Sequence, residues 1–117
     1  MPKTKRVSLT QKSLQKWKSE GWTCARVEHF NPYIGITQDL YGFIDILAMK
    51  EGEGFVGIQT TSRNHISTRI NKMRSLSTPK TFLEAGGRIV VEGWDKHRKD
   101  KQGKRELWRV KQTFYQG

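Results

Sequence analysis

Two apolar segments separated by a short glycine-containing turn constrain the fold more than any other feature of this chain. Residues 43–49 read FIDILAM, residues 54–61 read GFVGIQTT, and the turn between them lies in the stretch KEGEG. Apolar and β-branched runs on both sides of such a turn are typical of two antiparallel strands joined as a hairpin. The chain is therefore expected to build a β-sheet on this hairpin.

Helix and strand patterns on either side of the hairpin predict one α/β domain. Ser8 and Gln11 resemble a capping box, and Gly21 is a stop signal, so the first helix is expected between them. Further helices are expected over 64–76 and 78–87, further strands over 22–30, 88–94 and 106–115, and loops over 31–42 and 95–105. The expected order is helix, three strands, two helices and two strands, with a central mixed sheet flanked by helices.

The charge balance indicates the kind of partner. Lys and Arg number 22 against 11 Asp and Glu, which gives a net charge of +11. A surplus of this size favours a polyanion, because each neutralised phosphate releases a counterion. A nucleic acid, most simply DNA, is the expected partner. A structural or regulatory protein that binds another protein would need an acidic partner.

The rest of the sequence bears on domain organisation, zinc binding and membrane insertion. Residues 1–7 are expected to form a basic arm ahead of a single domain over 8–117. The lone Cys24 and three scattered histidines give no zinc-ligand spacing. No stretch approaches the roughly 18 apolar residues of a membrane span. The expectation is a cytoplasmic protein without membrane binding.

Asp45 is the residue of the hairpin that needs an explanation. It lies between Ile44 and Ile46, and a buried, unpaired carboxylate costs several kcal/mol. Strand alternation puts Gln59 and Thr61 on one face of the next strand. A carboxylate, an amide oxygen and a hydroxyl would then converge, and such oxygen ligands suit Mg²⁺ or Mn²⁺.

The motif G-F-I-D, followed by a hairpin, G-I-Q-T-T and a helix, resembles the PD-(D/E)XK nuclease superfamily, onto which residues 9 to about 93 can be laid. Asp45 matches the family's aspartate. Gln59 and Thr61 stand where the family has glutamate and lysine, which departs from the pattern. From about residue 39 onward the chain is also similar to small phage-encoded proteins with a Q-x-T-S element, which here is Gln59 to Ser62.

The resemblance implies a restriction-endonuclease-like core and metal-dependent hydrolysis of phosphodiester bonds. It gives Asp45, Gln59 and Thr61 as catalytic candidates, with Asp45 and Gln59 as ligands of Mg²⁺ or Mn²⁺. Because a single carboxylate would hold the ion weakly, Asp39 is a further candidate ligand and Glu28 a further catalytic candidate. Asp39 and Glu28 rank above Glu20 as the extra acid. Three replacements for the missing lysine stay open. They are the Lys50 side chain, the Arg63 side chain, and a water molecule held by Thr61.

The implied activity is that of a DNA endonuclease in the host cytoplasm, with branched or junction DNA as a candidate substrate and a homodimer as a plausible assembly. Basic and polar residues are candidates for nucleic-acid contact: Arg63, Asn64, His65, Arg69, Lys72, Arg74, Lys96, Arg98, Lys99, Lys101, Lys104 and Arg105. The departures at Gln59 and Thr61 favour an alternative, a nuclease-derived DNA-binding module without catalysis.

Overall fold

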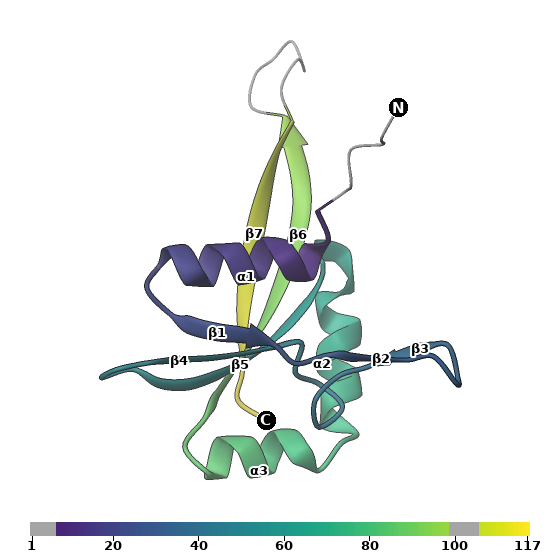
Figure 1. The fold of residues 1–117 in the computed structure, drawn as a ribbon, viewed down its shortest axis with the longest axis vertical. Coiled ribbons are helices and arrows are strands. Elements are labelled where there is room, and N and C mark those ends of the chain that lie inside the picture. The colour runs from purple at the N-terminus through teal and green to yellow at the C-terminus, as the bar shows by residue number, and fades with distance from the viewer. Residues whose placement is uncertain (1–6, 99–105) are drawn as a thin grey trace.

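The computed structural model describes residues 7–98 and 106–117, and within them an α/β domain is built on a five-stranded mixed sheet (Figure 1). The elements in chain order are α1 (Leu9–Ser19), β1 (Thr23–Arg26), β2 (His29–Asn31), β3 (Ile36–Gln38), β4 (Ile46–Lys50), β5 (Gly54–Ser62), the 3₁₀ turn η1 (Arg63–His65), α2 (Ile66–Arg74), α3 (Thr78–Glu84), β6 (Arg88–Arg98) and β7 (Glu106–Tyr115). The expected arm over residues 1–7 lies outside this description except for Val7.

The sheet grows outward from the β4–β5 hairpin that the sequence predicts. Its strand order is β1-β4-β5-β6-β7. β5 and β6 are parallel, whereas the other three pairings are antiparallel. The parallel pair needs a crossover, which η1, α2 and α3 supply. The mixed sheet and the flanking helices are therefore as expected.

Alternation along the strands gives the sheet two apolar faces, each covered by helices. On one face, α1 packs on the sheet through the cluster Leu14, Trp17, Ile46, Ala48, Val56, Ile58 and Val90. On the other face, the cluster is Phe43, Ile44, Ile66, Met73, Ile89, Val91 and Tyr115, joined by side chains of α2 and α3. Because neighbouring strand residues point to opposite faces, Gln59 and Thr61 lie on the α2 side of β5.

Glycine and capping residues fix how the helices meet the sheet. The predicted cap at Ser8 is confirmed, because its Oγ accepts a 3.1 Å hydrogen bond from the N–H of Gln11. A Cβ on Gly93 would lie 2.5 Å from the Ile66 Cδ1 and 2.8 Å from the Arg63 Cα. The absence of a side chain at Gly93 therefore lets the start of α2 lie directly on β6.

The predicted strand over 22–30 is wrong in its second half. β1 ends at Arg26, and residues 29–38 fold back as a separate two-stranded hairpin, β2–β3, that projects from the body (Figure 1). An Asn31 turn causes this: its Oδ1 accepts from the Tyr33 N–H at 3.0 Å, and its carbonyl accepts from the Gly35 N–H at 2.8 Å. The predicted loop over 31–42 thus contains β3.

The last two strands form a ribbon that extends beyond α1 (Figure 1). β6 continues to Arg98, four residues past the predicted end at Trp94, because β7 pairs with it as far as Arg98 and Glu106. Charged side chains do not prevent strand pairing at a ribbon whose faces meet water. In the described part of the chain, no helix is long and apolar enough to cross a membrane.

Candidate metal centre

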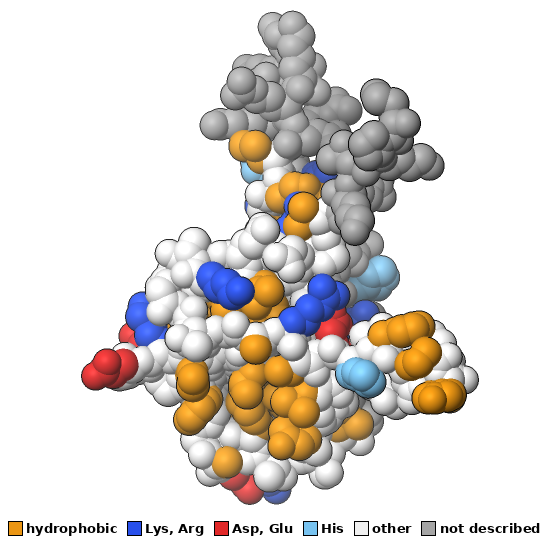
Figure 2. Space-filling model, viewed as in Figure 1, with side chains coloured by type: hydrophobic (Ala, Val, Ile, Leu, Met, Phe, Trp, Pro, Cys, Tyr) orange, Lys and Arg blue, Asp and Glu red, His pale blue; other side chains and the backbone are white. Residues whose placement is uncertain are grey.

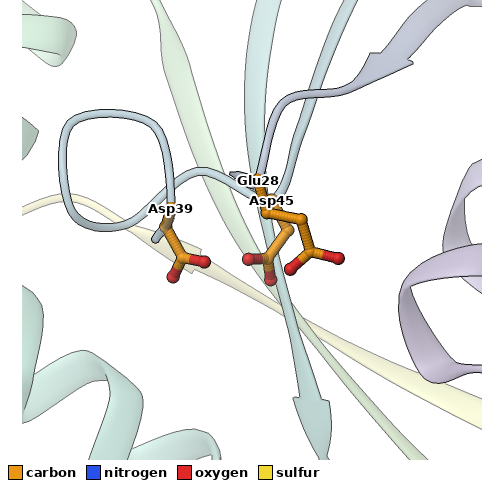
Figure 3. Close-up of side chains that lie close together, drawn as sticks. All are labelled: Glu28, Asp39 and Asp45. Carbon is orange, nitrogen blue, oxygen red and sulfur yellow. The ribbon is translucent and has the colours of Figure 1, made fainter. Parts of the chain in front are cut away.

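Three carboxyl groups from separate segments meet at the start of β4. Glu28 lies between β1 and β2, Asp39 directly follows β3, and Asp45 directly precedes β4. One carboxylate oxygen of each lies within 4.8 Å of the others. Figure 3 shows Asp39 and Asp45 turned toward one another, with Glu28 beside Asp45. The acids that the sequence proposes for a metal site are thus neighbours in space.

Asp45 is held firmly by the adjacent strand. Only 3% of the residue is exposed. Its Oδ2 accepts hydrogen bonds from the Thr60 N–H at 2.7 Å, the Thr60 hydroxyl at 3.1 Å and the Gln59 Nε2 at 3.1 Å. These bonds fix the carboxyl group where β5 passes it, which is the pre-organisation that a metal ligand needs.

The surroundings of Asp45 make its negative charge costly. Burial raises its pKa to about 8, assisted by a hydrogen bond with the Asp39 carboxyl and by the charges of Asp39 and Glu28, while the Thr60 N–H acts in the opposite direction. A carboxyl group with such a pKa holds a proton at neutral pH. A bound divalent cation would replace that proton and favour the charged form.

Gln59 connects two of the acids. It is 3% exposed, and its Nε2 donates to the Asp39 Oδ2 at 3.2 Å as well as to Asp45. In this orientation the amide offers hydrogen to both carboxylates. Rotation of the amide by half a turn would instead present its oxygen, which is the atom that a metal ligand must offer.

Thr60, rather than Thr61, is the threonine that contacts Asp45. The Thr60 hydroxyl also lies 2.8 Å from the Thr10 hydroxyl of α1. Thr61 is buried on the α2 side, where its hydroxyl accepts from the Arg69 Nε at 3.5 Å. Thr60 and Thr10 are not among the site residues predicted from the sequence, although the polar helix positions Thr10 and Ser13 beside Trp17 indicate a polar contact under α1.

Arg26 is a further residue that the sequence analysis missed. Its Nε donates to the Glu28 Oε1 at 2.6 Å. The guanidinium therefore compensates one of the three acids and lies at the edge of the centre. The two residues stand at i and i+2 around the end of β1, a spacing that places side chains on one face of a strand.

The other candidates for the missing lysine point elsewhere. The Lys50 Nζ donates to the Glu20 carbonyl at 3.1 Å, near Trp22 and at the opposite end of β4. Arg63 lies 3.9 Å from the Asp95 carboxylate. Glu20, the acid ranked last for the metal, pairs with Lys16 at 3.0 Å on the surface of α1.

Two of the residues expected to contact nucleic acid flank the centre. Arg69 reaches Thr61, and Lys72 lines a groove of about 400 Å³ together with Asp39 and the β3 residues Thr37 and Gln38. Lys72 therefore shares a groove with Asp39, one of the three acids, whereas Arg69 lies beside Thr61.

The remaining candidates make other contacts. Arg63 and Asn64 line a separate groove of about 770 Å³, Arg74 donates to Asn71, and the His65 ring lies 2.6 Å from the Ser62 hydroxyl. Lys96 lies over the Trp108 ring on the β6–β7 ribbon. Lys99, Lys101, Lys104 and Arg105 lie outside the described residues, as does the side chain of Arg98.

Comparison with known proteins adds no relative. Neither a protein-family model, nor a curated protein, nor a solved structure matches this chain.

Proposed function

We propose that this protein is a metal-dependent endonuclease that hydrolyses phosphodiester bonds in DNA. The observation that carries the proposal is the convergence of Glu28, Asp39 and Asp45 within 4.8 Å, with Lys72 lining the same groove as Asp39 and Arg69 beside Thr61. Three carboxylates would repel at this distance if all were charged, and a bound cation would favour the charged form of Asp45 over the protonated form. A PD-(D/E)XK-like core is part of the same proposal.

The donor set fits Mg²⁺ or Mn²⁺. Both ions prefer oxygen ligands and retain several waters, so three carboxylates from the protein are sufficient. Asp45 and Asp39 would hold the ion, and Glu28 would complete the set. Such an ion polarises the scissile phosphate and lowers the pKa of a bound water.

The protein's own groups would position the substrate. Arg69 and Lys72 would neutralise phosphates on either side of the bond to be cut. No lysine occupies the position of Thr61, so the Thr61 hydroxyl would orient a water instead. The buried Thr60 contacts would keep Asp45 in place during the reaction.

A second function has specific support. The Gln59 Nε2 donates to both Asp39 and Asp45, so these two carboxyl groups already share a hydrogen-bond donor without a cation. A nuclease-derived module that binds DNA without cutting it would have this arrangement. DNA binding is common to the two functions, and metal-dependent cleavage separates them.

The test is cleavage of labelled duplex, single-stranded and branched DNA in Mg²⁺ or Mn²⁺, with EDTA as the metal-free control. The proteins are the wild type, Asp45→Asn and the matched control Glu51→Gln, an exposed acid of the β4–β5 turn. Cleavage by the wild type and Glu51→Gln, lost in Asp45→Asn and in EDTA, is the expected result. DNA binding without cleavage by the wild type would support the binding module instead.

A further inference from the structure

The β2–β3 hairpin exposes a concentration of apolar side chains. Tyr33 is 94% exposed, Phe30 is 56% exposed, and Ile34 and Ile36 are each 55% exposed. Figure 2 shows apolar side chains gathered on this projection, apart from the body of the molecule. None of the four belongs to either of the two buried apolar clusters. Large apolar side chains grouped in this way mark an interaction surface.

The base of the same hairpin carries two acids of the candidate metal centre. Glu28 directly precedes β2 and Asp39 directly follows β3. Lys72 of α2 faces the β3 residues across the groove of about 400 Å³. A substrate that reaches the three acids therefore passes alongside the hairpin, with a cation on the other side of its path.

The net charge of the chain favours a nucleic acid over a second copy of the chain as the partner of this surface. Residues 29–38 contain no Asp, Glu, Lys or Arg, so the hairpin is neutral, whereas the chain as a whole carries +11. A second copy would bring the same positive charge, which opposes association. A nucleic acid satisfies the charge and also offers apolar base faces, on which aromatic side chains stack and between which apolar side chains insert.

We propose that the β2–β3 hairpin is a wedge that places Tyr33 and Ile34 against unstacked bases of DNA, and so selects branched over continuous duplex substrates. This inference rests on the proposed function, because it names the substrate class of the same centre. Bases at a branch point are already partly unstacked. Insertion of the hairpin there costs less unstacking energy than insertion into a continuous duplex. A duplex would still be held by its phosphates alone.

The test compares the affinities of the full chain for a four-way junction and for a duplex of the same sequence, in EDTA so that no cleavage occurs. The variants are Tyr33→Ser/Ile34→Ser and the matched control Phe55→Ser, which removes an apolar side chain that is 54% exposed outside the hairpin. We expect the double variant to lose about tenfold in its preference for the junction, with duplex affinity within about twofold of wild type. The control should keep the preference. A 2-aminopurine base at the branch should change its fluorescence with wild type and not with the double variant.

Two results would overturn the wedge, and a third would reject only the nuclease. An unchanged junction preference in the double variant would show that the hairpin does not contact the bases. A wild type that sediments as a dimer, and a double variant that sediments as a monomer with unaltered DNA binding, would assign the hairpin to a second copy. Failure of cleavage alone would reject the nuclease and leave the wedge intact, because affinity is measured without metal.

Discussion

The backbone N–H of Thr60 donates a 2.7 Å hydrogen bond to the Oδ2 of Asp45, and the Thr60 hydroxyl reaches the same oxygen at 3.1 Å. This relationship joins the two strands of the central hairpin at the point where the three acids meet. It also links the centre to α1, because the Thr60 hydroxyl contacts that of Thr10. The position of Asp45 is therefore fixed by contacts that also hold α1 against the sheet.

Thr60→Val should destabilise the protein measurably, because the substitution keeps the shape of the side chain and removes the hydroxyl. Asp45 and Thr10 would each lose a buried hydrogen-bond partner, at about 1–3 kcal/mol in the free energy of unfolding. Urea denaturation measures the loss. Thr61→Val is the matched control, with a smaller expected loss, since its hydroxyl has only a 3.5 Å contact from Arg69. Equal losses would contradict the role assigned to Thr60.

The stability of the metal-free protein should fall as the pH rises from about 4 to about 8. The pKa of Asp45 is raised to about 8 in the folded state, against about 4 in an unfolded chain. Between these values the folded state holds a proton that the unfolded state has lost, so unfolding becomes easier with increasing pH, by at most about 1.4 kcal/mol per pH unit.

Thermal melting in EDTA at several pH values checks this slope. Asp45→Asn removes the titrating group and should flatten the dependence, and Mn²⁺ should stabilise the wild type more at pH 8 than at pH 6. A slope that is the same in wild type and Asp45→Asn would contradict the assignment.

Glu92→Gln should separate a structural acid from the acids of the centre. Glu92 is fully buried and accepts from the Trp17 Nε1 at 3.0 Å and the Gln112 Nε2 at 2.7 Å, with the Lys16 Nζ at 3.4 Å. An amide at this position would face the Gln112 donor, so we expect a loss of about 2–4 kcal/mol in the free energy of unfolding.

The same variant should bind Mn²⁺ as the wild type does, because Glu92 faces α1 and belongs to no acidic cluster found among the described residues. Urea denaturation and a metal titration of the folded protein measure the two properties. Loss of Mn²⁺ binding in a folded Glu92→Gln protein would show that the centre extends to Glu92.

Arg69→Gln and Lys72→Gln should each reduce the salt dependence of DNA binding by about one unit of log K against log salt, because each removes one phosphate contact. Lys80→Gln on α3 is the matched control, since Lys80 is 82% exposed at its side chain and pairs with Glu84. Fluorescence anisotropy at a series of salt concentrations gives the slopes. Equal slopes in all three variants and the wild type would place the DNA away from α2.

The sequence predicts the part of the fold that follows from local patterns. The β4–β5 hairpin, the cap of α1 at Ser8, and β7 over Glu106–Tyr115 are confirmed. Asp45 could be singled out because a carboxylate between Ile44 and Ile46 conflicts with burial. These features depend on neighbours in the chain, which the sequence displays directly.

The features that the sequence does not predict depend on long-range register. Whether Thr60 or Thr61 contacts Asp45 depends on how β5 passes the start of β4, since the Thr60 contact includes its backbone N–H. Glu28 and Asp39 approach each other only because residues 29–38 close on themselves as a hairpin. Residues 22–30 alternate like one continuous strand, and the turn residues that follow do not show that the chain folds back on itself, so local patterns do not predict this hairpin.

Titration of the protein with Mn²⁺, followed by the electron paramagnetic resonance of the free ion, tests the central claim most directly. We expect one ion to bind per chain in the wild type and in Glu51→Gln. We expect no specific binding by Asp45→Asn, whose fold a melting curve confirms. Equal Mn²⁺ binding by wild type and Asp45→Asn, or none by the wild type at pH 8, would contradict the claim that Glu28, Asp39 and Asp45 form a metal centre.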